Sequence, residues 1–99
     1  MSDYQETLRQ HARLAILRAL EDAPRYTSNL SMLTTILPGF GISFTRDQTK
    51  TELGWLEEQG LIETETMRAV VIVTATVRGI EVAQGIARHP DIQRPRPGA

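Results

Sequence analysis

Residues 45–62 read TRDQTKTELGWLEEQGLI, and this stretch predicts a helix that runs directly into a β-strand. Thr45 followed three residues later by Gln48 is a capping-box pattern, in which the hydroxyl accepts from the backbone of Gln48 and the Gln48 amide reaches back to the cap. Gly60 follows the last turn, where the chain needs a left-handed residue that glycine adopts at low cost. We therefore expect a helix whose start and end are both defined.

The apolar positions of this stretch lie on one side of the predicted helix. Thr49, Leu53 and Leu56 form a narrow stripe at helical spacing, which is typical of a helix with one buried face. Trp55 lies on the flank of the stripe. Large aromatic side chains are usually well buried, so we expect Trp55 to pack at the edge of the core, with an interface anchor as the alternative.

The residues before this stretch predict two further helices. The first spans residues 3–22, with Ser2 or Asp3 as its cap, and ends before Pro24. Its apolar residues cover more than one side, and Leu14 emerges between polar positions. Such a helix is buried on two sides. In a chain of 99 residues the second side packs either on another copy or on the chain's own last helix.

A turn at residues 24–27 leads to the second of these helices, which Ser28 or Asn29 caps and Pro38 ends. Its apolar residues follow helical spacing: Leu30, Leu33, Ile36 and Leu37. The connection to the helix after Thr45 is longer than the turn of a simple helix-turn-helix. Three of its side chains are expected to fill the core: Phe40, Ile42 and Phe44.

Residues 61–67 and 69–75 are rich in threonine and β-branched residues, which indicates the two strands of a tight hairpin with Arg68 at its tip. Residues 70–73 are all apolar, so we expect the second strand to be covered on both faces. In the first strand Glu63 and Glu65 should face water.

Thr76 is the predicted cap of a last helix that runs from Val77 to about Arg88 and contains Gly79 and Gly85. Glycine lowers helix stability by about 1 kcal/mol relative to alanine. Two such residues suggest a close approach to a neighbouring helix, for which the first helix is the candidate.

Residues 1–90 are assigned to one domain, and residues 91–99 to a flexible basic tail that is extended or disordered. The RPRP sequence within this tail is either a basic arm or a solvated end.

The composition excludes several classes of protein. The absence of cysteine excludes disulfides and thiolate metal sites. The longest apolar run, residues 69–75, is too short to cross a bilayer, and the polar start of the chain has no basic leader. We therefore expect a soluble cytoplasmic protein.

No group of residues predicts catalysis. His11 and His89 are isolated in the sequence, and Glu57 and Glu58 would point about 100° apart on a helix, which prevents them from sharing a proton. The Gly-x-Gly pair at residues 39–41 does not follow a strand, as a phosphate-binding loop would. We therefore expect neither an enzyme nor a metal or other cofactor.

The order helix, helix, helix, hairpin, helix resembles a winged helix-turn-helix domain. Residues 76–83, TVRGIEVA, are similar to the Thr-x-x-Gly start that follows the wing in bacterial regulators of the MarR and PadR kind. Residues 14–20, 46–48 and 52–61 resemble small uncharacterised winged-helix proteins of Mu-like transposable phages and prophages. The resemblance implies a mostly helical α+β fold with three helices, a two-stranded wing and a C-terminal helix.

The same resemblance implies a function. The helix after Thr45 would be the recognition helix that enters the major groove of double-stranded DNA, in a phage or prophage transcriptional regulator. Because winged helices also serve as protein-interaction modules, an adaptor in phage assembly or regulation that binds no DNA is the alternative.

Side chains suited to DNA lie in the first two turns of this helix and at the hairpin tip. Arginine and glutamine can read guanine and adenine edges, and lysine can contact phosphate. The predicted DNA-binding residues are Thr45, Arg46, Gln48, Lys50, Thr51 and Arg68.

The overall charge argues against strong nonspecific DNA binding. The net charge is −1 and the isoelectric point about 6.1, whereas nucleic-acid-binding domains are usually basic. Carboxylates that would repel phosphate also lie on the same elements: Asp47, Glu52, Glu57, Glu58, Glu63 and Glu65. They are concentrated toward the C-terminal half of the helix, so insertion by its N-terminal end would keep them away from the duplex.

We also predict a homodimer through the first and last helices, because their surfaces lack enough partners within one short chain. The predicted interface residues are Leu14, Gly79, Ala83, Gly85 and Ile86.

Overall fold

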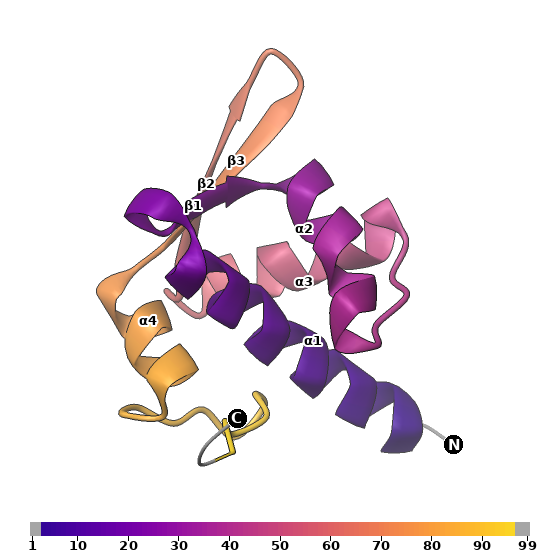
Figure 1. The fold of residues 1–99 in the computed structure, drawn as a ribbon, viewed down its shortest axis with the longest axis vertical. Coiled ribbons are helices and arrows are strands. Elements are labelled where there is room, and N and C mark those ends of the chain that lie inside the picture. The colour runs from indigo at the N-terminus through magenta and orange to yellow at the C-terminus, as the bar shows by residue number, and fades with distance from the viewer. Residues whose placement is uncertain (1–2, 97–99) are drawn as a thin grey trace.

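The computed structural model of the protein describes residues 3–96. Over this range the chain forms four α-helices and a three-stranded antiparallel sheet, which confirms the mostly helical α+β class. The elements are α1 (Asp3–Asp22), the 3₁₀ turn η1 (Pro24–Tyr26), β1 (Thr27–Asn29), α2 (Leu30–Ile36), the 3₁₀ turn η2 (Leu37–Phe40), α3 (Arg46–Glu58), β2 (Ile62–Met67), β3 (Val70–Ala75) and α4 (Val77–Gln84). Figure 1 shows the β2–β3 hairpin projecting from the helical body, with the start of α1 at the opposite end.

The starts of α2 and α3 follow from local capping. Asn29 Oδ1 accepts a hydrogen bond from the backbone N–H of Met32 at 2.7 Å. At α3 both halves of the predicted capping box are present. Gln48 N–H donates to Thr45 Oγ1 at 3.1 Å, and Thr45 N–H donates to Gln48 Oε1 at 2.8 Å. Each cap is made within three residues, and for that reason the sequence predicts the capping box at Thr45 and includes Asn29 as one of its two candidates for α2.

The bounds of α1 also agree with the prediction, since the helix spans residues 3–22. Ser2, one of the two caps proposed for it, lies outside the described residues. At the end of α3 the backbone of Gly60 has a φ of +76°, so the predicted left-handed glycine after that helix is confirmed.

α4 ends four residues earlier than predicted. Gly85 has a φ of +82°, and its N–H donates to carbonyl groups of the last turn, so the helix stops at Gln84. The predicted extension to Arg88 is wrong because Gly85 closes the helix instead of lying inside it. Thr76 caps the other end as predicted, with Oγ1 accepting from the N–H of Gly79 at 3.1 Å.

β3 is the central strand of the sheet, in the order β1-β3-β2. The sequence missed β1 because three residues after a turn carry no alternating pattern. Only pairing with β3, which places Thr27 opposite Thr74, makes this segment a strand. The hairpin turns at Arg68 and Ala69, whose φ angles of 51° and 69° are typical of a two-residue type I′ turn.

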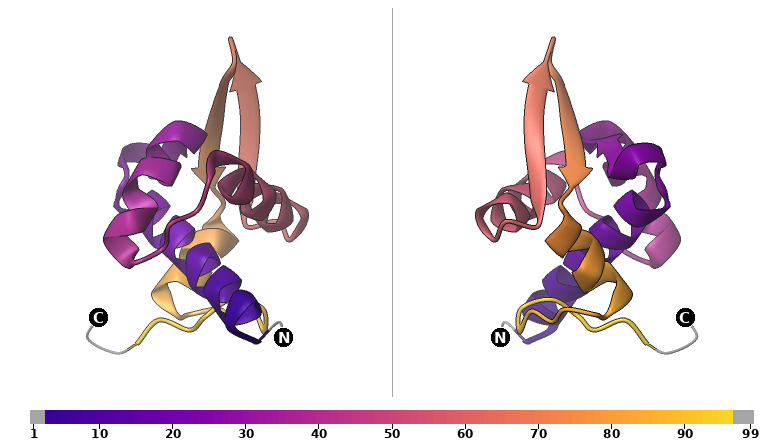
Figure 2. Two further views of the ribbon diagram at one scale, coloured as in Figure 1. Left: turned by 90° about the vertical axis from the view of Figure 1, so that its right-hand side faces the viewer. Right: turned by 90° about the vertical axis from the view of Figure 1, so that its left-hand side faces the viewer.

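The second hairpin strand, β3, was expected to be buried on both faces, but it is buried in this way only at its base. Val73 is fully buried, but Val70 near the tip is 47% exposed. Figure 2 shows the tip extending beyond all the helices, so no element covers that part of β3. The expectation is therefore wrong for the outer half of the strand.

The core lies where α1 crosses the other helices and the base of the sheet. Its fully buried side chains include Ile16, Leu17, Leu20, Leu30, Leu33, Leu37, Leu56, Leu61, Ile62 and Val73. Of the three loop side chains expected there, Ile42 is buried and Phe44 packs partly against the core, but Phe40 is 51% exposed. Phe40 belongs to η2, which turns its ring outward. None of the described helices is both long and apolar enough to span a membrane.

Gly79 marks a close approach to the expected neighbour α1, and a still closer one to the link between α3 and β2. A Cβ atom at this position would collide with the backbone carbonyl of Leu61 and touch the side chain of Leu17 on α1. The same junction is held by Thr76, which donates from its N–H to Leu61 O at 3.0 Å and from Oγ1 to Gly60 O at 2.8 Å. The start of α4 is thereby fastened to the link between α3 and β2.

Residues 91–93 pack against α1, whereas the sequence placed residues 91–99 in a separate tail. The side chain of Ile92 is 4% exposed, and the N–H of Gln93 donates to Gln10 O at 3.2 Å. Residues 97–99 of the predicted tail lie outside the described residues.

Gly79→Ala should lower the free energy of unfolding by about 1–3 kcal/mol, the usual effect of forcing a methyl group into a packed site. The matched control is Gly54→Ala in α3, where a Cβ would meet no atom within 4 Å. That change should raise the free energy of unfolding by about 1 kcal/mol, because alanine is the better helix former. Urea unfolding measures both, and a Gly79→Ala protein as stable as the wild type would contradict this packing.

Candidate functional site

The outer face of α3 carries most of the residues predicted to contact DNA. All six predicted residues, the five at positions 45–51 and Arg68 at the hairpin turn, are exposed. Figure 2 shows α3 on one side of the molecule with the hairpin rising beside it. The arrangement brings the five α3 residues together on one helix end, and leaves Arg68 apart at the far tip of the hairpin.

Two of these residues already have a structural role. The Gln48 amide oxygen is held by the N–H of Thr45, and the Thr45 hydroxyl by the N–H of Gln48. An amide that reads adenine in the major groove must present both its oxygen and its nitrogen to the base. The capping box therefore limits Gln48 as a base reader.

Arg46 and Lys50 are the two cations of α3, and both are exposed. No ion pair joins either of them to another residue in the described range. They lie four residues apart on a helix, which places them on the same side, one turn above the other. The positive end of the helix dipole adds to their potential, so this end of α3 can attract an anion.

Glu52 does not face solvent, contrary to the expectation that it would repel phosphate. Its side chain is 4% exposed and lies between two cations of α1. Arg13 Nε donates to Glu52 Oε1 at 2.7 Å, and Arg9 Nε donates to Oε2 at 3.0 Å. The sequence missed this ion pair because its partners lie some forty positions earlier and a glutamate is usually exposed.

Glu57 is also engaged within the chain. Its carboxylate accepts hydrogen bonds from the N–H of Thr64 at 3.2 Å and from the Thr64 hydroxyl at 2.8 Å. These bonds join the end of α3 to the base of β2. Of the four carboxylates on α3, Asp47 and Glu58 are the two that remain exposed without such a bond to another described residue.

Gly54 lies near the middle of the exposed face and was not singled out by the sequence. A Cβ atom there would meet nothing within 4 Å, so no packing within the described chain requires a glycine. The absence of a side chain leaves the helix backbone open to solvent at this point. A signal was present in the sequence, since glycine inside a capped helix is unfavourable without a packing or functional reason.

Trp55 belongs to the support of the site. The guanidinium carbon of Arg13 lies 3.9 Å from the centre of its ring, and His89 packs edge-on against it with a centroid distance of 5.0 Å. His89 Nδ1 accepts from the N–H of Asp91 at 3.1 Å, so Nε2 carries the proton and donates to Gln59 Oε1 at 2.9 Å. These contacts agree with a packed aromatic at the edge of the core.

The residues predicted to form a dimer interface divide into two groups. Leu14, Gly79 and Ala83 are buried by the chain itself, so the argument that they lack partners is wrong. Gly85 and Ile86 are exposed, Ile86 to 73%. Across the described residues, His, Asp and Glu side chains form no group of three that could hold a metal ion.

The chain is similar to two proteins of unknown function. It is 39% identical over 94 residues to the uncharacterized protein gp26 of Escherichia phage Mu, an alignment that covers 95% of this chain and 97% of that protein. It is 38% identical over 65 residues to an uncharacterized protein of Haemophilus influenzae, which covers 66% of this chain and 63% of the other. No protein-family model and no solved structure matches the chain.

Glu52→Gln should lower the free energy of unfolding by about 3–5 kcal/mol, since removing one partner of a buried ion pair leaves the other charge buried without compensation. The control is Glu58→Gln on the exposed face of the same helix, which should change the free energy of unfolding by less than about 0.5 kcal/mol. Chemical unfolding followed by circular dichroism compares the two, and similar effects would show that the buried pair does not hold α3 in place.

Proposed function

The chain belongs to the same family as the uncharacterized protein gp26 of Escherichia phage Mu, and we propose that it is a winged-helix protein that binds double-stranded DNA sequence-specifically, as a phage or prophage transcriptional regulator. In this proposal it acts as a homodimer in the bacterial cytoplasm and catalyses no reaction. The observation that carries the proposal is the outer face of α3. Arg46 and Lys50 are exposed there, while Glu52 is buried against α1 and the exposed carboxylate of Glu57 is hydrogen-bonded to Thr64.

The shape of α3 suits insertion into DNA. The major groove is about 12 Å wide and admits a single α-helix. α3 has 13 residues and one face free of contacts with the other elements, with the hairpin beside it in the position of a wing. Of its three exposed carboxylates, Asp47 lies in the first turn and Glu57 and Glu58 lie at the end, so the two cations one turn apart give the first turns of this face a net positive charge.

Each side chain has a distinct role in the proposal. Arg46 is the candidate base reader, because a guanidinium can donate two hydrogen bonds to the edge of guanine. Lys50 is the candidate phosphate contact. Thr45 and Gln48 hold the helix end in position through the capping box, and the hydroxyl of Thr51 donates to Asp47 O at 3.0 Å.

Gly54 supports a close approach of the ligand. Alanine there would favour the helix by about 1 kcal/mol, and nothing in the described chain excludes it. A phosphate or sugar that packs directly on the helix backbone would exclude it. Glycine at this position is therefore accounted for by the proposed complex.

A protein-binding adaptor is the second candidate, and the hairpin favours it. Met67 and Val70, which face one another next to the turn, are 51% and 47% exposed. The same face of the hairpin carries Glu63 and Glu65, which are also exposed. An acidic strand with an apolar tip suits a protein partner better than a phosphate backbone.

Lys50→Ala should weaken binding to all duplexes and reduce the slope of log K against log salt by about one, as the loss of one phosphate contact does. Arg46→Ala should instead cost about 1–3 kcal/mol of binding free energy at particular base pairs. Fluorescence anisotropy with duplexes from the region that flanks the gene, at several salt concentrations, measures both. If Arg68→Ala has the larger effect, the hairpin and not α3 makes the main contact.

Absence of binding to any duplex below about 10 µM at low salt, where nonspecific affinity is strongest, would favour the adaptor instead. In that case Asp47, Glu57 and Glu58 become the candidate contacts of a protein partner.

Gly54→Ala separates stability from binding. The variant should be more stable than the wild type and yet bind DNA about tenfold more weakly, because the added methyl group keeps the duplex from the helix backbone. Anisotropy and urea unfolding of the same preparation test this. A variant that is stabilised and binds equally well would remove the argument for a close approach at this residue.

A further inference from the structure

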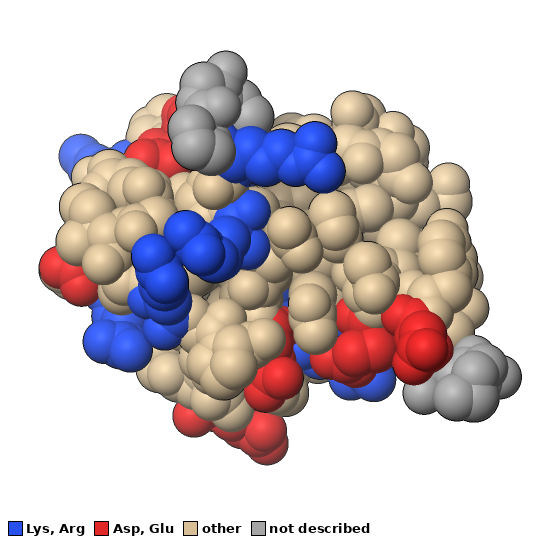
Figure 3. All heavy atoms as spheres, turned by 90° about the horizontal axis from the view of Figure 1, so that it is seen from below, with Lys and Arg blue, Asp and Glu red and all other residues tan. Residues whose placement is uncertain are grey.

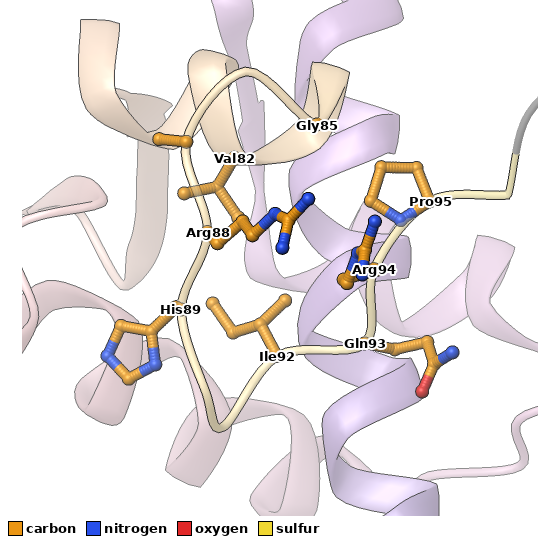
Figure 4. Close-up of a pocket in the computed structure, with 9 residues that line it drawn as sticks. Val82, Gly85, Arg88, His89, Ile92, Gln93, Arg94 and Pro95 are labelled. Carbon is orange, nitrogen blue, oxygen red and sulfur yellow. The ribbon is translucent and has the colours of Figure 1, made fainter.

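The chain that follows α4 folds back over α1 and forms an open hollow on the surface. The hollow has a volume of about 450 Å³ and is lined by Arg88, His89, Pro90, Ile92, Gln93 and Arg94. Figure 4 shows the adjoining pocket, which shares Arg88, His89, Ile92, Gln93 and Arg94 with this hollow; in it the side chains of Arg88 and Arg94 lie on the same side as Ile92, and the His89 ring turns away. The hollow therefore combines two guanidinium groups with an apolar floor.

These two cations lack a counter-ion within the part of the chain that the structure describes. The ion pairs there involve Arg9 and Arg13, and none reaches Arg88 or Arg94. The negative end of the α4 dipole favours a cation close to the helix end, but this effect falls off within one turn and does not account for Arg94. Two like charges that share one hollow are stabilised by an anionic group placed between them.

The start of α1 has the complementary chemistry. Its first turn carries two carboxylates, Asp3 and Glu6, and between them Tyr4 is 72% exposed. Glu6 accepts from Gln10 Nε2 at 3.3 Å and lies 3.8 Å from Arg13 Nη1, whereas Asp3 has no such contact with any described residue. The carboxylates of this turn could pair with the guanidinium groups of the hollow, and its aromatic ring could pack on the apolar floor.

Both features lie on the same face of the molecule. Figure 3 views the end opposite the hairpin and shows cations gathered toward the left and top of this face and a cluster of acidic side chains at the lower right, with some charges of the opposite sign beside each group. Because this face carries both a basic area and an acidic cluster, it can pair with the same face of a second copy. A two-fold axis between the two areas would place the acidic turn of each copy on the basic hollow of the other.

We propose that the Arg88 and Arg94 hollow binds the first turn of α1 of a second copy of this chain, with the carboxylates of Asp3 and Glu6 at the guanidinium groups and the ring of Tyr4 over Ile92. This names the surface of the homodimer in the proposed function, but it does not depend on DNA binding. It differs from the dimer predicted from the sequence, because Leu14, Gly79 and Ala83 are used inside the chain.

The test exploits the two-fold symmetry with two charge-reversed proteins. One carries Arg88→Glu and Arg94→Glu, and the other carries Asp3→Lys and Glu6→Lys. Each alone would bring like charges together at both contacts and should dimerise at least about tenfold more weakly than the wild type. An equimolar mixture pairs an acidic hollow with a basic turn and a basic hollow with an acidic turn, so it should recover the dimer. Sedimentation velocity at about 50 µM, a concentration that populates a specific dimer, reads the mass directly.

Two further variants keep the test decisive. Tyr4→Ala leaves all charges in place and should also weaken the dimer, which matters if the lysine variant folds poorly. Arg78→Glu reverses an exposed cation in the first turn of α4, away from the hollow, and should leave the mass unchanged. A monomeric wild type, or a mixture that remains monomeric while both variants fold, would overturn the proposal. DNA binding by a monomeric wild type would leave the proposed function standing and remove only this surface.

Discussion

The buried ion pair between Arg13 on α1 and Glu52 on α3 is the interaction on which the rest of the structure depends. Both side chains are less than 5% exposed, and their closest atoms are 2.7 Å apart. Removing two charges from water costs several kcal/mol per ion, and the pair offsets this only if the remaining donors are satisfied. Here Arg13 also donates to Asp91 O at 2.8 Å and lies over the ring of Trp55, while Arg9 provides a second cation for Glu52. The described chain has no buried side-chain polar atom without a partner.

This pair decides which face of α3 meets solvent. Glu52 lies between Thr49, Leu53 and Leu56 on the helix surface, so its attachment to α1 turns that side inward and the opposite side outward. Arg46, Lys50 and Gly54 are on the exposed side as a consequence. The net charge of the chain is therefore a poor guide to the charge of this face, because internal bonds engage two of the four α3 carboxylates.

The same arginine connects the helices to the chain that follows α4. Its bond to Asp91, the burial of Ile92 and the bond between Gln93 and Gln10 hold residues 91–93 against α1. His89 completes this attachment by joining Gln59 at the end of α3. The hollow at Arg88 and Arg94 exists only because the chain returns in this way, which places it on the same face as the acidic start of α1.

The sequence by itself determined the elements whose signals are local. The caps at Thr45 and Thr76, the left-handed Gly60 and the tight hairpin around Arg68 each depend on residues only a few positions apart, and the sequence identified them; it narrowed the cap of α2 to Ser28 or Asn29, of which Asn29 is the one used. Gly85 is also a left-handed glycine that ends a helix, but it was predicted to lie inside the last helix. Only the tertiary structure decided the burial of Glu52, the pairing of β1 with β3 and the return of Ile92 to the core. Each of these rests on partners about 40 to 80 positions away, and no local pattern records which distant residue will satisfy a charge, an exposed strand edge or an apolar side chain.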